Sequence, residues 1–242
     1  METMMDIDDE NEMRNRLSTD STSYQIQECI LYGTIHGKYV SDLEKRLAGL
    51  CDPGSDDFHE HEMSFSLRTG MNMSPDVSIK IRRRFKPDPA SHNQWLFRYI
   101  GVPEPDAKCP VIVRKVINSV VHTQDCMMFA KTLGLRMDYE YMAKGKLWTK
   151  GNIKIVTNLL SRTERPGQYD NNSIKPVSES VLVEISCALP ESAEYTMAAK
   201  QIRDFSDQLM PLVCMEKVDY WRKYCSTGTV ASQLGPTPAP PM

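Results

Sequence analysis

The feature that most constrains the fold is a stretch of alternating residues between positions 135 and 160. Apolar side chains occupy every second position at its start, namely Leu135, Met137, Tyr139 and Tyr141. A period of two is typical of a β-strand with one buried and one solvent-exposed face. Strand-like sequence resumes at Leu147 after Lys144-Gly145, which predicts a turn because glycine tolerates positive φ. A second pair, Lys150-Gly151, predicts a bulge or bend. The stretch as a whole predicts one long antiparallel hairpin.

Six further runs have strand character, and turn-forming residues separate them. The short spacing is that of an antiparallel meander and is too short for crossover helices. Together with the hairpin these runs give eight strands, which favours a closed barrel because closure removes exposed sheet edges. The expected strands begin near Tyr24 and end near Gly33 or Gly37, and then cover 62–68, 77–85, 95–100, 111–121 and 180–189.

Three amphipathic segments predict helices that cover the outside of the barrel. We expect Ser41, Thr123 and Ser192 to cap their N-termini. The predicted fold class is mainly β, a single eight-stranded antiparallel barrel with about three helices packed outside. An acidic tail over residues 1–22 and a Pro/Ser/Thr-rich tail over 225–242 are expected to be disordered. The barrel domain is expected to span residues 23–224.

Bulk properties exclude several classes of protein. The formal net charge of −3 provides no general attraction for nucleic acid. No apolar run is long enough to span a bilayer, and the acidic N-terminus is unlike a signal peptide. The seven cysteines form no CxxC pair and their number is odd, so we expect reduced, buried thiols. His59 and His61 are two residues apart beside Glu60 and Glu62; a zinc site is the weaker hypothesis and a surface cluster on an edge strand the stronger.

A charged lumen is one alternative that would make the barrel an enzyme. The predicted strands carry cations at Lys80, Arg82, Arg84, Arg98, Arg114 and Lys154 and carboxylates at Glu60, Glu62 and Glu184. The basic run Arg82-Arg83-Arg84 is itself interpreted as a solvated strand face, because Arg83 faces away from its two neighbours. A lumen with these charges would resemble that of the triphosphate tunnel hydrolases, in which carboxylates hold a divalent cation and basic residues grip phosphates. Those enzymes carry a Glu-x-Glu-x-Lys run on the first strand, where this chain has Gln25-Ile26-Gln27. Because amides cannot neutralise a metal ion, this phosphohydrolase hypothesis is the weaker one.

An RNA-binding barrel is a further alternative. Trp95, Phe97 and Tyr99 share one face of a predicted strand and could stack on bases. The same spacing is that of a buried strand face, and we interpret these three aromatic residues as part of the core.

Five segments of the chain together carry a family resemblance. In order they are HEMSFSLR, WLFRYIG, RMDYEYMAKGKLWTKGNIKI, SVLVEISCALP and DQLMPLVCMEKVD. They resemble the Mediator complex subunit 18 family, and the resemblance covers residues 26–219. It implies an eight-stranded barrel decorated by helices, in a nuclear, non-catalytic interaction subunit of the Mediator head module without cofactor or metal. The implied partners are the related barrel of subunit 20 and a C-terminal helix of subunit 8.

Apolar residues near the C-terminus are the candidate partner-binding residues. They are Leu209, Leu212, Val213 and Met215, which follow the third predicted helix at a position where a terminal segment is ordinarily polar. A partner helix lying on an apolar groove is the mode of recognition that we expect. The alternative is that the same four side chains pack on this chain's own barrel. The sequence leaves both open.

Overall fold

A computed structural model describes residues 25–67, 77–85, 92–164, 169–170 and 173–218. The tails that the sequence predicts to be disordered, 1–22 and 225–242, lie outside these residues, and the boundaries of the barrel domain at 23 and 224 stay a prediction. None of the helices in the described ranges is long and apolar enough to cross a bilayer. The elements are β1 (Gln25–His36), the 3-10 helix η1 (Gly37–Tyr39), α2 (Val40–Leu50), β2 (Asp56–Leu67), β3 (Val77–Arg84), β4 (Gln94–Pro103), β5 (Ile112–His122), α3 (Cys126–Thr132), β6 (Arg136–Lys150), β7 (Ile153–Thr163), β8 (Ile174–Pro176), β9 (Ser180–Pro190) and α4 (Thr196–Asp207).

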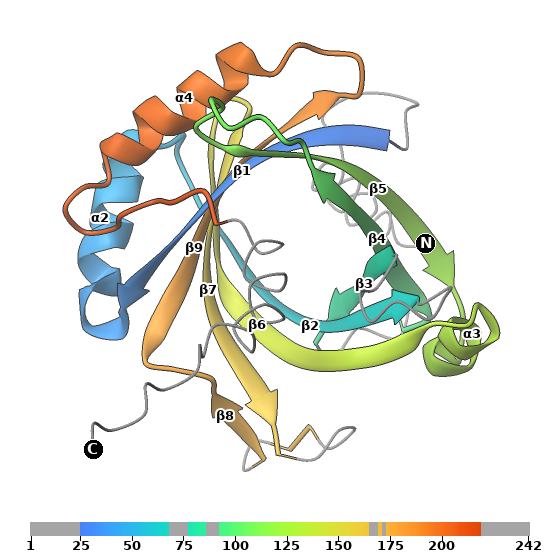
Figure 1. Ribbon diagram of the computed structural model, residues 1–242. Coiled ribbons are helices and arrows are strands. Elements are labelled where there is room, and N and C mark those ends of the chain that lie inside the picture. Colours follow the sequence, from blue (N-terminus) through green and yellow to red (C-terminus); the bar gives the residue numbers. More distant parts are fainter. Residues whose placement is uncertain (1–24, 68–76, 86–91, 165–168, 171–172, 219–242) are drawn as a thin grey trace, which may run out of the picture.

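The strands form a closed antiparallel barrel. The sheet runs β6-β2-β3-β4-β5-β1-β9-β7-β8, and a pairing between β6 and β7 closes the ring, which Figure 1 shows end-on. Eight strands make the ring, and the short β8 pairs only with β7 at the barrel rim. The predicted fold class is therefore confirmed. The sequence did not predict β8, which lies in a segment rich in turn-forming residues.

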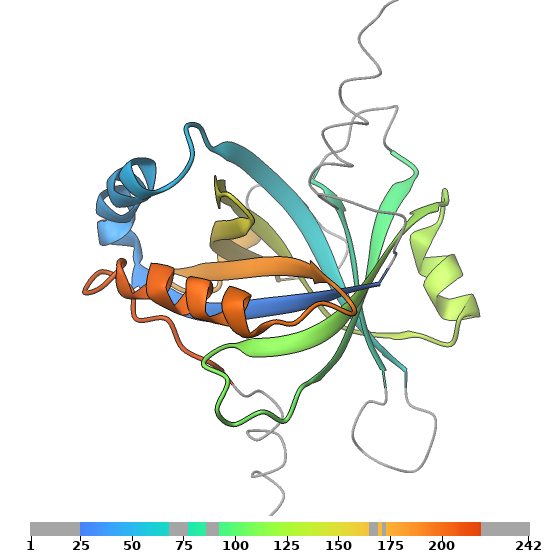
Figure 2. The ribbon, with the colours of Figure 1, turned by 90° about the horizontal axis from the view of Figure 1, so that it is seen from above.

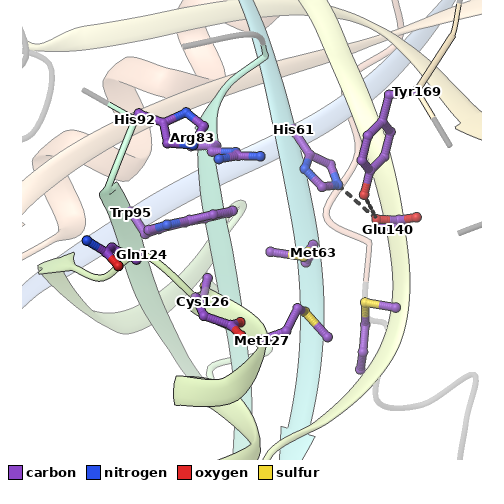
Figure 3. A pocket seen from close by; sticks show the side chains of 12 residues that line it. His61, Met63, Arg83, His92, Trp95, Gln124, Cys126, Met127, Glu140 and Tyr169 are labelled. Carbon is purple, nitrogen blue, oxygen red and sulfur yellow. Dashed lines mark hydrogen bonds and ion pairs between the residues drawn. The ribbon is translucent and has the colours of Figure 1, made fainter. Parts of the chain in front are cut away.

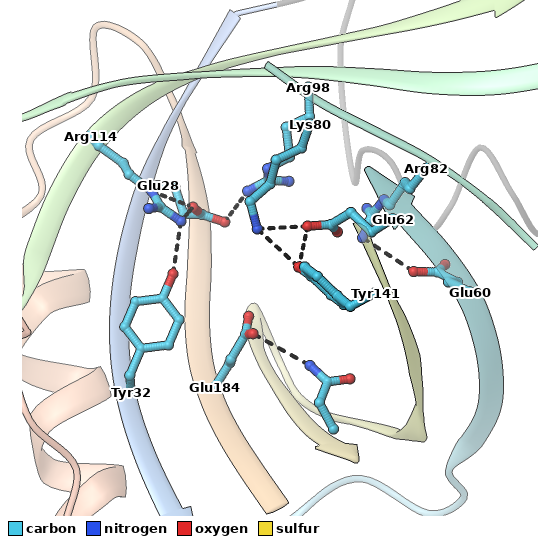
Figure 4. Close-up of polar contacts among 11 residues, drawn as sticks. Glu28, Tyr32, Glu60, Glu62, Lys80, Arg82, Arg98, Arg114, Tyr141 and Glu184 are labelled. Carbon is cyan, nitrogen blue, oxygen red and sulfur yellow. Dashed lines mark hydrogen bonds and ion pairs between the residues drawn. The ribbon is translucent and has the colours of Figure 1, made fainter. Parts of the chain in front are cut away.

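Apolar side chains of the strands point outward, toward helices, and polar side chains point into the barrel. On β9, for example, Val183 and Ile185 are fully buried on the outer face, while Glu184 between them faces the lumen (Figure 4). A helix-covered outer face can bury apolar side chains just as a barrel interior does. The protein is thus held together by a core outside the barrel wall and a polar lumen within it.

The larger outer cluster lies under α2, α4 and the chain that follows α4. Both helices flank the same side of the barrel, close to β1 and β9 (Figures 1 and 2). Leu43 and Leu47 come from α2, and Ile202 and Phe205 come from α4; all four are at most 2% exposed. The predicted apolar stripes of these two helices are therefore confirmed. The same cluster includes Cys29, Leu31, Val183, Ile185 and Cys187 from the strands.

The smaller outer cluster lies on the opposite side, under α3 (Figure 2). It joins Phe65 of β2, Ile81 of β3 and Phe97 of β4 to Ala130 of α3. Trp95 also belongs to it, so the interpretation of the strand aromatics as core is confirmed for Trp95 and Phe97, whereas Tyr99 is half-buried outside this cluster. With seven residues, α3 covers much less of the wall than α2 and α4 do together.

The two glycines of the predicted hairpin have exchanged roles. The turn lies at Gly151, where φ is +58°, and β6 runs without interruption through Gly145. A Cβ atom at Gly145 would lie 1.6 Å from the carbonyl oxygen of Thr157. The turn predicted at Lys144-Gly145 was therefore wrong, because Gly145 lies within β6 and allows the neighbouring strand to approach closely. The bulge or bend predicted at Lys150-Gly151 was also wrong, because the hairpin turn begins there.

Two further details of the prediction were wrong. The N-terminal cap of α3 is Asp125 and not Thr123, because the Asp125 carboxylate accepts a hydrogen bond from the Met128 amide at 2.8 Å. Ser41 does not cap α2, and Ser192 does not cap α4. The alternation at the start of β6 does not mark a buried face throughout, since Met137 and Tyr139 are 36% and 56% exposed. Neighbouring elements decide which face of a strand is covered, and these two side chains are covered only in part.

Candidate functional site

The barrel lumen contains a dense network of ion pairs and hydrogen bonds to which all eight barrel strands contribute. Within the described chain its members are the carboxylates Glu28, Glu60, Glu62 and Glu184, the cations Lys80, Arg82, Arg98, Arg114 and Lys154, and the polar side chains Tyr32, Tyr141 and Asn158 (Figure 4). They share the lumen because they occupy alternate positions of their strands, on the face opposite the outer clusters.

Glu28 is the most strongly held carboxylate of the network. Arg114 donates two hydrogen bonds to its Oε2 atom, at 3.0 and 2.8 Å, and Arg98 donates to Oε1. Arg114 also donates to the Tyr32 hydroxyl at 3.0 Å. Burial by itself would raise the pKa of Glu28, but the charges of Arg98 and Arg114 outweigh it and lower that pKa to about 2. Glu28 is therefore ionised at every physiological pH.

Glu62 is the centre of a second group. Lys80 Nζ lies 2.7 Å from its Oε1 atom, and the Tyr141 hydroxyl donates a hydrogen bond to the same oxygen. Desolvation opposes ionisation of Glu62, yet the positive charges of Lys80 and Arg82 lower its pKa below the ordinary value. Burial and the neighbouring Glu62 charge raise the pKa of Tyr141, so this phenol stays protonated and acts as a donor.

The remaining charged groups extend the network beyond these two centres. Arg82 and Glu60 form an ion pair at 3.4 Å, and the Asn158 amide donates to Glu184 at 3.3 Å. Burial raises the pKa of Glu184. Burial, with the charges of Arg82 and Arg98, lowers the pKa of Lys154 to about 8. The charges of the network are thus compensated mainly by ion pairs between its own members.

The carboxylates of the described lumen are paired with cations. A hard divalent cation needs several converging carboxylate oxygens, whereas Glu28, Glu60 and Glu62 each accept from a cation on a neighbouring strand. Among the described residues, no three His, Cys, Asp or Glu side chains gather closely enough to hold a metal. What the lumen can do is fix the relative positions of the strands through charge-assisted hydrogen bonds.

The sequence predicted most of this network and missed its centre. Eight of the nine charged residues named from the sequence meet in the lumen, including Glu60, Lys80 and Glu184, whereas Arg84 is not part of the described network. The basic run at 82–84 was interpreted as a solvated strand face, which is wrong for Arg82. Glu28, Tyr32 and Tyr141 were missed. A signal for Glu28 was present, because it is the only acidic residue in the apolar strand Gln25–His36.

A cavity of about 410 Å³ lies outside the barrel wall, beside α3 (Figure 3). On one side of it, His61 Nε2 lies 2.9 Å from the Glu140 carboxylate, which also accepts from the Tyr169 hydroxyl at 2.9 Å. His61 is only 4% exposed, so the interpretation of His59 and His61 as a surface cluster on an edge strand was wrong: β2 pairs with neighbours on both sides. Burial lowers the pKa of His61.

The candidate partner-binding residues lie on the segment that follows α4. Leu209, Val213 and Met215 are at most 3% exposed and belong to the larger outer cluster, while Leu212 is half-buried against it. An antiparallel bridge between Tyr32 and Glu216 holds the segment against β1 at Gly33, and Arg46 of α2 donates to the carbonyl oxygens of Leu209 and Met210. These contacts are those of the alternative in which the segment packs on its own barrel. Partner binding by these residues stays a prediction.

Comparison with known proteins identifies the family of this chain. The family model described as Med18 protein matches residues 27–222, nearly the whole of the barrel and its helices. The chain belongs to this family. One Med18 relative, the Mediator of RNA polymerase II transcription subunit 18 of Caenorhabditis elegans, is 63% identical over 223 residues, which are 92% of this chain and 96% of the relative. The predicted family resemblance is therefore confirmed.

Solved structures agree on the fold. A chain of the Schizosaccharomyces pombe Mediator head module superposes with a TM-score of 0.67 at 15% identity, covering 79% of this chain and 98% of that one. The mimivirus capping enzyme triphosphatase superposes with a TM-score of 0.50 at 6% identity, covering 86% and 99%. At these identities both matches describe architecture alone. The Med18 barrel thus shares its architecture with a triphosphatase.

Proposed function

We propose that this protein is a non-catalytic subunit of the Mediator co-activator, acting in the nucleus in transcription by RNA polymerase II. The observation that carries the proposal is the 63% identity to the worm Mediator subunit over nearly the full length of both chains. The closed barrel suits this role because its wall is rigid and its outer faces are large. Its contribution is to hold protein partners, as the resemblance to the subunit 18 family implies.

The proposed partners are other head subunits, specifically the subunit 20 barrel and the C-terminal helix of subunit 8. The segment after α4 is the proposed contact surface. Leu209, Val213 and Met215 pack in the larger outer cluster and so hold the segment on the barrel. The apolar side chains that the segment exposes are those of Met210, which is 50% exposed, and half-buried Leu212. A helix with an apolar stripe could bury both of them.

Affinity purification of the tagged full-length chain from nuclear extract tests this proposal. We expect mass spectrometry to identify other Mediator head subunits in the eluate. The double variant Met210→Asp with Leu212→Asp should recover the two named partners poorly while its circular dichroism is unchanged, since burying an unpaired carboxylate is unfavourable. Met197→Asp is the matched control, because Met197 is an exposed apolar residue on the neighbouring α4. An eluate without Mediator subunits would contradict the proposed function.

Absence of catalysis is part of the same proposal. With Mg²⁺ or Mn²⁺, the purified chain should release no phosphate from nucleoside triphosphates or tripolyphosphate, because Glu28 and Glu62 are already paired with cations. The informative control is Glu184→Gln, since Glu184 forms no ion pair with a described residue at 4 Å or less. Phosphate release that this substitution abolishes would establish the tunnel-type phosphohydrolase instead.

A further inference from the structure

The network in the barrel lumen has more cations than carboxylates. It contains the five cations and four carboxylates named above, and two of the cations, Arg98 and Arg114, share the single carboxylate of Glu28. Burial also raises the pKa of Glu184, which disfavours the negative charge of that carboxyl group. The network therefore carries an excess of positive charge inside the barrel.

Two of the cations face each other across the lumen. β4 and β7 are four strands apart in either direction around the ring, so they lie on opposite sides of the barrel. Arg98 of β4 and Lys154 of β7 point inward, since their neighbours Phe97 and Ile155 are buried in the outer clusters. Arg82 reaches the same region from β3. Burial, followed by the charges of Arg82 and Arg98, lowers the pKa of Lys154 to about 8, so the three cations are close enough to repel one another.

The two arginines retain hydrogen-bond donors for a further partner. A guanidinium carries five N–H groups. Among the described residues, Arg98 donates only to Glu28, from Nη2, and Arg82 donates only to Glu60, from Nη1 at 3.4 Å. Both side chains extend into the lumen (Figure 4), yet they remain 17% and 27% exposed. Water or a small ligand can therefore reach their remaining donors.

We propose that the lumen binds one small tetrahedral oxyanion, of the phosphate or sulfate class, between Arg82, Arg98 and Lys154. The interior of an eight-stranded barrel is filled by side chains or holds one small ligand. The oxygens of a tetrahedral ion point in four directions, so one ion can accept charge-assisted hydrogen bonds from cations on opposite walls. A planar carboxylate reaches fewer of them. The inference does not depend on the proposed role in Mediator.

The bound ion connects strands that share no backbone hydrogen bond. β4 pairs with β3 and β5, and β7 pairs with β6, β8 and β9. An ion held by Arg98 and Lys154 braces the barrel across its width and offsets the repulsion between these two cations. Because the site exists only in the folded barrel, the ion stabilises the folded state by mass action.

Isothermal titration calorimetry of the full-length chain with sodium sulfate tests the proposal. Sulfate is the probe because its charge does not change near neutral pH, and sodium chloride keeps the ionic strength constant. We expect saturable binding of one ion for each chain. Inorganic phosphate should compete for the same site, and sodium acetate at the same concentration should not.

Lys154→Gln is the most informative variant. Because the lowered pKa means that the folded barrel disfavours the charge of Lys154, its removal should leave the protein folded, which circular dichroism checks. The affinity for sulfate should fall about tenfold, since one charge-assisted hydrogen bond is lost. Lys144→Gln is the matched control, because Lys144 is an exposed lysine on the neighbouring β6, and it should bind sulfate as the wild type does. Both variants retain the general stabilising effect of sulfate on proteins, so their difference reports the site alone.

The pH dependence of binding is an independent readout. Only the protonated amine of Lys154 attracts an anion, and without the ion its pKa is about 8. The affinity for sulfate should therefore fall as the pH rises through 8, and saturating sulfate should raise the Lys154 pKa, which nuclear magnetic resonance of the side chain measures. In Lys154→Gln this pH dependence should disappear. The charged groups that face Lys154 from other strands are Arg82, Arg98, Glu28, Glu60 and Glu184.

Three results would overturn the proposal. The first is the absence of saturable sulfate binding to the wild-type chain. The second is equal affinity of the wild type and Lys154→Gln, which would place the ion outside the lumen. The third is binding of tripolyphosphate without binding of sulfate or phosphate, which would assign the lumen to a polyphosphate chain.

Discussion

The lumen and the outer faces of this barrel are stabilised by different forces. In the lumen, Glu28 and Glu62 are held by cations and hydroxyl groups from neighbouring strands. On the outer faces, side chains such as Ile202 and Leu47 are buried in apolar packing. Removing one partner of a buried ion pair leaves an uncompensated charge, whereas truncating an apolar side chain leaves a cavity. The two regions should therefore respond differently to substitution and to pH.

The largest effect is expected at Glu28. Glu28→Gln should lower the free energy of unfolding by about 3–5 kcal/mol, because Arg98 and Arg114 would lose the charge that compensates theirs in a buried site. Urea unfolding followed by circular dichroism measures this. Glu191→Gln is the matched control at the surface, where Glu191 pairs with Lys115 and is 41% exposed, and it should cost less than about 1 kcal/mol. Equal losses for the two variants would contradict a charge-stabilised lumen.

An outer-face truncation should cost slightly less. Ile202→Ala should lower the free energy of unfolding by about 2–4 kcal/mol, because Ile202 is fully buried between α4 and the barrel wall. This loss should be the same at pH 7 and pH 4, since no charge is involved. Met197→Ala on the exposed side of α4 is the control, with an expected change below about 0.5 kcal/mol. A strong pH dependence of the Ile202→Ala effect would show that the two regions are coupled.

Acid should affect the lumen selectively. The folded-state pKa of Glu28 is about 2, below its ordinary value of 4.5, so its contribution to stability is complete above pH 4.5 and is lost as the pH falls toward 2. Over that range the difference in unfolding free energy between the wild type and Glu28→Gln should shrink by about 3 kcal/mol. Unfolding curves at a series of pH values measure the difference. A constant difference from pH 6 to pH 2 would contradict the depressed pKa.

The smallest effect concerns the helix that covers the smaller cluster. Asp125→Ala should lower the free energy of unfolding by about 1 kcal/mol, because it removes the hydrogen bond that caps α3. Asp125→Asn, which keeps an acceptor oxygen, should cost only a few tenths of that. Amide hydrogen exchange should show faster exchange in α3 and unchanged exchange in α4 for the alanine variant. Loss of protection in α4 as well would mean that the two outer clusters unfold together.

The eight strands of the ring, its closure and the placement of three helices were predictable, because the strands alternate apolar and polar residues and the turns between them are short. What alternation cannot reveal is which face is the interior. In this barrel both faces are covered over much of their length, so Tyr141 in the lumen and exposed Tyr139 belong to the same sequence pattern. The prediction took that pattern to mark one buried face.

Charges that recur along a strand made part of the lumen predictable, and single charges such as Arg98 and Glu184 were named as well. Lys80 and Arg82 stand two apart on β3 and were named from the sequence, whereas Glu28 has no acidic neighbour at that spacing and was missed. The exchange of roles between Gly145 and Gly151 has a similar origin. Both follow a lysine in a strand-like run, and only the three-dimensional distance between Gly145 and Thr157 distinguishes them.

The position of β1 between β5 and β9 has a consequence for biosynthesis. β1 is the first strand to leave the ribosome, but one of its two neighbours, β9, comprises residues 180–190. Because domains form as units and non-local strand pairing is slow, the ring cannot close until almost the entire barrel sequence has been translated. During synthesis β1 therefore has one unpaired edge, and a nascent chain arrested before residue 180 carries an open sheet that chaperones can recognise.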